Sequence, residues 1–304
     1  MCKEIVDNTG KLRDMSKIAL GSVQFGIDYG INSGVKVQSN EVINIINCAR
    51  NNHIKLLDTA KLYGSSEQVL GDVNTQDFDI VTKTRSFDQE VITEKVAKFV
   101  INDLYQSLKL LKQKSLYGLL VHHGEDLLKP GGEMIFNQLQ ILKEQGLVNK
   151  IGVSAYIDSQ LIKIIDRFDI DIIQFPMNIL DRRLIDNGIL NKIYSKGIEI
   201  HTRSIFLQGL LLMDHKKRPK QFDRWSSLWK FWHEWLADNK LSALEATIRY
   251  MISIPEISKV LVGVDNKDQL QNIINAIDGN LPPIPEELSI NDTDLLNPVN
   301  WSNL

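Results

Sequence analysis

Eight short apolar stretches alternate with longer amphipathic stretches along most of the 304-residue chain. The short stretches have the length of buried strands, and the longer ones repeat apolar residues at three and four positions, which is typical of helices. We expect strands in residues 18–26, 54–58, 78–85, 116–123, 150–156, 171–178, 197–204 and 259–263, and helices in residues 41–50, 96–111, 136–145, 159–168, 184–195 and 268–277.

This alternation restricts the architecture. Strands joined by helices pair in parallel with right-handed crossovers, and eight such units in about 250 residues are the usual size of a (β/α)8 barrel. An open doubly wound sheet would place Gly-x-Gly-x-x-Gly after its first strand, and Gly21-Ser-Val-Gln-Phe-Gly26 lacks this spacing. No linker separates the units, so the sequence predicts a single (β/α)8 TIM barrel domain over residues 1–304.

Polar side chains stand at the ends of three adjacent predicted strands. Asp58 and Tyr63 follow the second strand, Lys83 ends the third and His122 ends the fourth. The C-terminal ends of barrel strands converge on one rim, where barrel enzymes carry their chemistry. We therefore expect an acid, a phenol, an amine and an imidazole to meet there.

Two helix ends carry local signals. Ser65 or Ser66, followed by Glu67, resembles a helix N-cap with a capping-box acid. Gly146 is expected to close the helix of residues 136–145, because glycine adopts the left-handed conformation that ends many helices.

The four rim residues form a set suited to proton transfer. An ammonium near a phenol stabilises the phenolate, so Lys83, held in place by Asp58, would make Tyr63 a better proton donor. His122 would orient a substrate oxygen by hydrogen bonding. An aldolase that uses Lys83 as a Schiff-base amine is the alternative, but it leaves Tyr63 without a role.

His123 is expected to be an ordinary neighbour of His122, because successive strand residues point to opposite faces. The same alternation argues against a metal site made of these two histidines and Asp58, since adjacent strand histidines do not readily share one ion. We predict no metal.

The same residues carry a resemblance to the aldo-keto reductase superfamily. Residues 57–71, with the sequence LDTAKLYGSSEQVLG, match the acid–tyrosine signature of that family at its full spacing. The other family motifs follow in the expected order: Lys83 in Val-Thr-Lys-Thr, His122 in Leu-Leu-Val-His, Gly152-Val-Ser154, and Gln174 with Asn178. The resemblance extends from about residue 17 to residue 276.

The resemblance implies a barrel that binds a nicotinamide dinucleotide, usually NADPH, and reduces an aldehyde or ketone to an alcohol. Tyr63 would be the general acid, Lys83 and Asp58 would tune it, and His122 would orient the substrate. Ser154 and Gln174 would bind the nicotinamide carboxamide, residues 204–209 the pyrophosphate, and residues 263–269 the adenosine end. The implied cofactor-binding residues are Gly21, Ser154, Gln174, Arg203, Ser204, Gly209, Gly263, Lys267 and Gln269.

The chain departs from the family pattern near the cofactor. Arg203 stands where relatives often have an aromatic residue that stacks on nicotinamide, and Ala155 stands where many have Asn. Residues 263–269 lack the Arg that commonly grips the ribose phosphate of NADPH. Lys267 would replace it, whereas Asp265 would favour a ribose hydroxyl, so NADH is the alternative cofactor.

A tryptophan-rich segment follows the seventh predicted strand. Trp225, Trp229, Trp232 and Trp235 share one helical face, which predicts packing against the barrel, with a pocket wall or dimer contact as alternatives. The resemblance implies that residues 210–240 and the tail at 280–304 shape substrate choice. Lys and Arg residues between 210 and 222 would suit an acidic or phosphorylated substrate such as a sugar nucleotide, although lysines are usually solvated.

Composition excludes several other classes. The net charge of −3 and the absence of Lys/Arg blocks argue against nucleic-acid binding, and no apolar run approaches the roughly 20 residues that span a bilayer. The N-terminus lacks a secretion signal, and Cys2 and Cys48 match no disulfide or metal pattern, so we expect a cytoplasmic protein. It would act on a small carbonyl compound as a monomer or homodimer, or serve as a cofactor-binding sensor with little catalysis.

Overall fold

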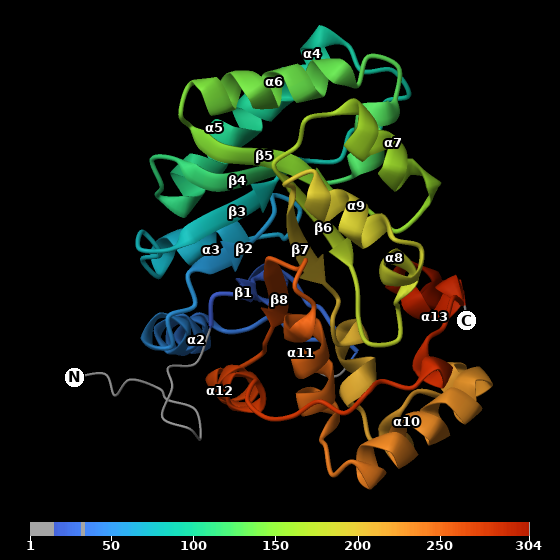
Figure 1. The fold of residues 1–304 in the computed structure, drawn as a ribbon. Helices are drawn as coiled ribbons and strands as arrows, with labels where there is room; N and C mark the ends of the chain where they lie inside the picture. Colours follow the sequence, from blue (N-terminus) through green and yellow to red (C-terminus); the bar gives the residue numbers. More distant parts are fainter. Residues whose placement is uncertain (1–14, 32–33, 304) are drawn as a thin grey trace.

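The computed structural model describes residues 15–31 and 34–303. Eight parallel strands close into a barrel in sequence order, as the resemblance and the alternation predict (Figure 1). They are β1 (Ile18–Gly21), β2 (Leu56–Asp58), β3 (Asp79–Lys83), β4 (Leu116–Val121), β5 (Val148–Ser154), β6 (Ile172–Pro176), β7 (Glu199–Arg203) and β8 (Lys259–Gly263). The barrel closes where Ala19 of β1 pairs with Leu56 on one side and with Leu261 on the other.

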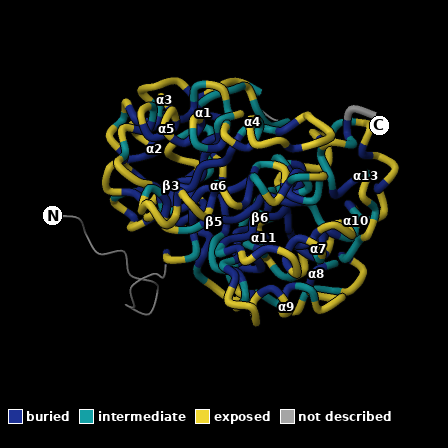
Figure 2. The backbone as a smooth tube through the Cα atoms, turned by 90° about the horizontal axis from the view of Figure 1, so that it is seen from above, coloured by how far each residue is buried: buried dark blue, intermediate teal, exposed yellow. Residues whose placement is uncertain are grey.

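Helices surround the strands. The longer ones are α2 (Ser39–Asn51), α3 (Ser66–Asp72), α5 (Phe99–Leu111), α6 (Glu133–Glu144), α7 (Ser159–Arg167), α9 (Ile189–Ser195), α10 (Ser226–Asp238), α11 (Ala243–Ser253) and α12 (Lys267–Ala276). One-turn helices are α1 (Val23–Gly26), α4 (Glu94–Ala97), α8 (Arg183–Asp186) and α13 (Thr293–Leu296). Buried backbone occupies the centre in Figure 2 and exposed backbone the margin, because each helix turns its apolar stripe toward the strands.

The two predicted helix ends have different outcomes. Gly146 follows α6 with φ of +71°, as expected for a glycine that ends a helix. The capping box at α3 is wrong, because Ser65 makes no side-chain cap hydrogen bond. Ser66 Oγ instead donates to the Ser22 carbonyl at 2.9 Å, and Glu67 Oε1 accepts from Thr82 Oγ1 at 2.7 Å. The side chains that the local sequence assigns to the helix cap therefore bind the residue after β1 and a residue of β3.

The tryptophan face of α10 is buried, as the spacing predicts. It packs against the segment that follows β7 and against the C-terminal tail. Trp232 Nε1 donates to the Leu211 carbonyl at 3.3 Å, and Trp225 Nε1 donates to Asp292 at 3.0 Å. The ring of Trp301 meets that of Phe222 edge-on at 5.0 Å. In Figure 1, α10 and α13 accordingly lie together beside the barrel.

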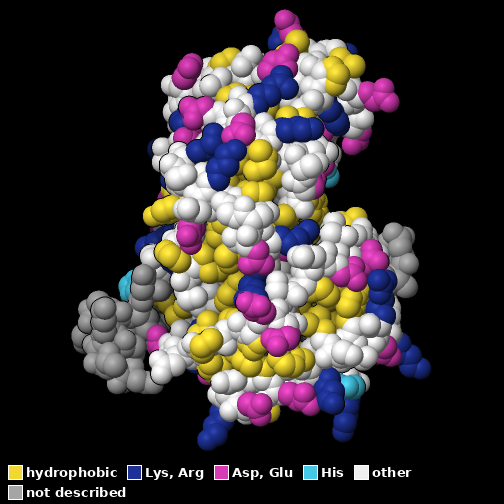
Figure 3. All heavy atoms as spheres, turned by 45° about the vertical axis from the view of Figure 1, so that its right-hand side comes forward, with side chains coloured by type: hydrophobic (Ala, Val, Ile, Leu, Met, Phe, Trp, Pro, Cys, Tyr) yellow, Lys and Arg dark blue, Asp and Glu magenta, His cyan; other side chains and the backbone are white. Residues whose placement is uncertain are grey.

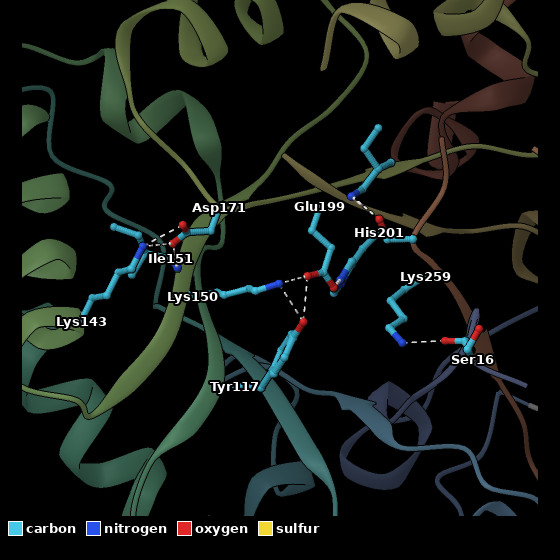
Figure 4. A network of polar contacts seen from close by, with 11 residues as sticks. Ser16, Tyr117, Lys143, Lys150, Ile151, Asp171, Glu199, His201 and Lys259 are labelled. Atoms are coloured by element: carbon cyan, nitrogen blue, oxygen red, sulfur yellow. Dashed lines mark hydrogen bonds and ion pairs between the residues drawn. The ribbon is translucent and has the colours of Figure 1, made fainter. Parts of the chain in front are cut away.

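A polar network lies near the N-terminal ends of the strands (Figure 4). Glu199, the first residue of β7, accepts hydrogen bonds from Tyr117 Oη at 2.8 Å and Lys150 Nζ, and its other oxygen lies 2.7 Å from His201 Nε2. Burial raises the pKa of Glu199, but the contacts with His201 and Lys150 outweigh it and lower that pKa to about 2. Glu199 is therefore a carboxylate at neutral pH.

The surface mixes both signs of charge. On the face drawn in Figure 3, basic and acidic side chains are interspersed, in keeping with the net charge of −3. Within residues 15–31 and 34–303, no helix is long and apolar enough to cross a membrane.

Candidate active site

Two strand ends build a buried ion pair. Asp58 is the last residue of β2 and Lys83 is the last residue of β3, and adjacent parallel strands place these ends side by side. Lys83 Nζ lies 2.6 Å from Asp58 Oδ1 and donates to the Thr59 carbonyl at 2.9 Å. The ammonium is thereby fixed, and its carboxylate partner is as deeply buried as it is.

The second oxygen of Asp58 is held from across the barrel. Gln174 Nε2 on β6 donates to Asp58 Oδ2 at 2.8 Å. This bond fixes the orientation of the amide and leaves Gln174 Oε1 buried with no hydrogen-bond partner in the part of the chain that the structure describes. Because buried polar atoms are normally satisfied, this oxygen is a candidate acceptor for a ligand.

Tyr63 stands in the turn between β2 and α3. Its ring centroid lies 5.0 Å from Lys83 Nζ and 5.8 Å from the His122 ring, which meets it edge-on at 88°. The turn rests directly on Gly26, where a Cβ atom would lie 1.7 Å from the Tyr63 carbonyl oxygen. Gly64 adopts φ of +56°, so two glycines allow the close approach that positions Tyr63.

His122 follows β4 and is held by its backbone. Its N–H donates to Thr84 Oγ1 at 3.3 Å, and its Nδ1 is buried without a hydrogen-bond partner among the described residues. Burial, followed by the charges of Lys83, His123 and Arg203, lowers its pKa to about 3. His122 is therefore a neutral imidazole at physiological pH.

These side chains surround a cavity of about 440 Å³ at the C-terminal rim of the barrel. Most of the predicted site residues line it: Gly21, Asp58, Tyr63, His122, Ser154, Gln174, Arg203, Ser204, Gly209, Gly263 and Gln269. Lys83 lies buried behind Asp58 and does not form the wall. Lys267 also lies outside the lining, and its backbone N–H donates to Glu41 at 2.7 Å.

Strand alternation does not separate His123 from His122, and the expectation that His123 has no catalytic role stays a prediction. His122 and His123 both line the cavity, because β4 ends at Val121 and strand alternation no longer applies beyond it. His123 Nδ1 lies 3.6 Å from Glu125 Oε1, and this carboxylate raises the pKa of His123. The two imidazole rings lie 5.3 Å apart at the cavity wall.

Several lining residues escape the sequence analysis, among them Gln24, Tyr29, Tyr156 and Gln208. Tyr29 follows the predicted strand of residues 18–26, so the rule that marks polar residues after strands would have found it. Gln24 lies inside that predicted strand, which the structure ends at Gly21 and continues as α1. Burial and the nearby Tyr63 raise the pKa of Tyr29. A hydrogen bond with Gln208 lowers it, but by less. Gln208 carries no such signal, because a left-handed backbone at φ of +52° brings it to the cavity.

The loop after β7 has an unusual backbone. Ser204, Leu207, Gln208 and Gly209 have φ of +58°, +46°, +52° and +96°. Left-handed residues among right-handed ones turn successive amide groups to one side, an arrangement that binds anions. Together with the unpartnered Gln174 Oε1, this loop fits a ligand that carries both an amide and phosphate groups.

The comparisons with known proteins agree with this geometry. Residues 17–287 match the Aldo/keto reductase family. The chain belongs to this family. Membership implies an oxidoreductase that acts on carbonyl compounds, and aldo-keto reductases generally use nicotinamide cofactors. No curated protein matches the chain in sequence.

Two solved structures share the fold of this aldo-keto reductase. The holo form of an aldo-keto reductase from Bacillus halodurans is 20% identical, with 88% of each chain covered and a TM-score of 0.69. The glycerol dehydrogenase from Gluconobacter oxydans is 17% identical, with 89% of this chain and 92% of that chain covered and a TM-score of 0.69. At these identities the likeness concerns the fold.

Proposed function

We propose that the chain reduces an aldehyde or ketone to an alcohol with NAD(P)H, and that Tyr63 is the general acid. The supporting observation is the position of Tyr63 on the cavity wall, between the buried Lys83–Asp58 pair and the neutral His122. This arrangement offers a proton donor, a fixed cation behind it and an uncharged hydrogen-bonding group beside it.

Each side chain has a defined role in the proton transfer. Tyr63 Oη donates its proton to the carbonyl oxygen as that oxygen becomes negative. The Lys83 ammonium stabilises the phenolate that remains, and Asp58 keeps the ammonium in place at 2.6 Å. His122 hydrogen-bonds the substrate oxygen and adds no charge, since its pKa of about 3 keeps it neutral.

The cavity residues suit a nicotinamide dinucleotide. Gln174 and Ser154 would hold the carboxamide, and the loop of residues 204–209 would hold the pyrophosphate. The bound cofactor supplies the hydride. At the adenosine end Asp265 lines the cavity and Lys267 does not, which supports NADH, whereas the family expectation is NADPH.

Titration of the purified protein with NADPH and with NADH, followed by turnover of a panel of aldehydes and ketones, tests the proposal. We expect micromolar binding of at least one cofactor and its oxidation on addition of a carbonyl. Binding without turnover of any carbonyl would favour a cofactor-sensing role. Absence of binding to either cofactor would contradict the proposed function.

A further inference from the structure

Among the described residues that line the cavity, two carboxylates have a charged partner. Asp58 is paired with Lys83, and Glu125 faces His123 at 3.6 Å. Arg203 also lines the cavity, and no ion pair joins its guanidinium to a carboxylate within residues 15–31 and 34–303. Arg203 is half-buried, and a guanidinium with no carboxylate partner among the described residues is a candidate group for an anionic ligand.

The guanidinium of Arg203 stacks on an aromatic ring at the cavity wall. Arg203 ends β7, and its guanidinium carbon lies 4.8 Å from the ring centroid of Tyr156. The hydrogen bond from its Nη2 to the Ala155 carbonyl is long at 3.5 Å. The stacking holds the planar group in place, and among the described residues only Ala155 accepts from its N–H donors, which leaves the others for a carboxylate or phosphate.

The charge of Arg203 reaches the groups around the carbonyl site. It is one of the charges that lower the pKa of His122, after burial and Lys83, and it opposes the burial that raises the pKa of Tyr29. The positive charge of Arg203 is therefore felt in the part of the cavity that Tyr63 and His122 line.

The basic segment at residues 210–222 does not supply this charge. Of that segment, only Leu212 and no Lys or Arg is among the described residues that line the cavity. Arg218 is buried with its guanidinium 4.1 Å from the Trp229 ring centroid, and Lys216 and Lys217 are exposed. An anionic substrate would therefore find its partner at Arg203, and not in the lysines suggested by the sequence.

We propose that Arg203 determines specificity by binding an anionic group, a carboxylate or a phosphate, on the carbonyl substrate. The preferred substrates are then oxo acids or phosphorylated aldehydes and ketones, whose carbonyl oxygen meets Tyr63 while the anion meets the guanidinium fork. This inference rests on the proposed reductase function, because it places the anion beside a carbonyl held for reduction.

Matched pairs of substrates test the inference. The kcat/KM values of para-carboxybenzaldehyde and its methyl ester, and of glycolaldehyde phosphate and glycolaldehyde, are measured for wild type, Arg203→Gln and Arg203→Lys. The first pair reports on a carboxylate and the second on a phosphate. Lys216→Gln removes a positive charge from the exposed segment and is the matched control.

We expect wild type to prefer the charged member of at least one pair, and Arg203→Gln to lower the charged-to-neutral ratio by about 10- to 100-fold. Arg203→Lys should retain part of the preference, and Lys216→Gln should keep the ratio unchanged. The ratio isolates substrate recognition, because an effect on the cofactor changes both members equally.

Two results would overturn the inference while the reductase function stands. One is turnover of neutral carbonyls by wild type with no preference for charged ones. The other is an equal loss for both members of each pair in Arg203→Gln, accompanied by weaker cofactor binding, which would assign the guanidinium to the cofactor phosphates. Failure of wild type to reduce any carbonyl would instead contradict the proposed function itself.

Discussion

The two ends of the barrel each contain an acid, a lysine, a tyrosine and a histidine. The C-terminal rim has Asp58, Lys83, Tyr63 and His122, and the N-terminal end has Glu199, Lys150, Tyr117 and His201. The likeness extends to geometry, because the lysine Nζ lies 5.0 Å from the tyrosine ring centroid in both sets. Residue composition therefore does not distinguish the two ends.

The hydroxyl group of the tyrosine distinguishes them. At the N-terminal end Tyr117 Oη donates to Glu199 at 2.8 Å and accepts from Lys150 at 3.0 Å (Figure 4). Tyr63 instead lines the cavity, and no protein group in the described part of the chain hydrogen-bonds its hydroxyl. We infer that the acid–lysine pair at the N-terminal end stabilises the fold. The pair at the C-terminal rim instead supports Tyr63 as a proton donor.

Removal of the lysine should distinguish the two ends most strongly, both in the free energy of unfolding and in turnover. Lys83→Met leaves Asp58 buried and unpaired, which should lower the free energy of unfolding by about 3–5 kcal/mol and lower turnover by about 10²- to 10⁴-fold. Lys150→Met should cost less than about 2 kcal/mol and spare turnover, because the Lys150 side chain is 32% exposed. Urea unfolding and carbonyl reduction measure both effects. Equal losses of turnover in the two variants would remove the distinction.

A double variant sharpens this comparison. Asp58→Asn combined with Lys83→Met removes both charges, so most of the lost stability should return while turnover stays low. Recovery of turnover together with stability would show that the ammonium acts only through the fold. The same two measurements decide between these outcomes.

Glu199→Gln should have an intermediate effect that depends on pH. The pKa of Glu199 is lowered from 4.5 to about 2, so its stabilisation is present above about pH 4.5 and is lost as the pH falls toward 2. The variant should be about 2–3 kcal/mol less stable at pH 7, and the difference should shrink across that window. Unfolding of both proteins at a series of pH values checks this. A difference that stays constant with pH would contradict the assignment.

His122→Gln should have the smallest effect on stability. Because the folded protein holds the pKa of His122 at about 3, below the ordinary 6.5, the unfolded chain binds more protons between these values and wild type loses stability as the pH falls through them. The variant should lose about 2 kcal/mol less between pH 7 and pH 5. An identical pH dependence in both proteins would show that His122 titrates normally.

The sequence predicts the barrel and its rim better than the surroundings of the rim. Asp58 and Lys83 end strands, and strand order alone brings them together. Glu67 of α3 accepts a hydrogen bond from Thr82 on β3, and no local capping pattern reveals this contact between two elements of the fold. His123 reaches the cavity because β4 ends two residues earlier, and strand ends are the least certain part of a periodic pattern.

Side chains on the long loops are harder still to place. Gln208 reaches the cavity through a left-handed backbone that non-glycine residues rarely adopt, and the fold around it enforces this conformation. Lys267 and Asp265 are two residues apart, yet of these two only Asp265 lines the cavity, because Lys267 already begins α12 and its backbone N–H binds Glu41. The local pattern does not specify such turns.

The most direct test compares Tyr63→Phe with Tyr117→Phe in a single turnover of carbonyl reduction at saturating cofactor. The account predicts that Tyr63→Phe slows the reaction by at least about 10²-fold with little change in cofactor affinity. Tyr117→Phe should keep the rate and lower the free energy of unfolding by about 1 kcal/mol. A wild-type rate in Tyr63→Phe, or an equal slowing in Tyr117→Phe, would contradict the assignment of Tyr63 as the proton donor.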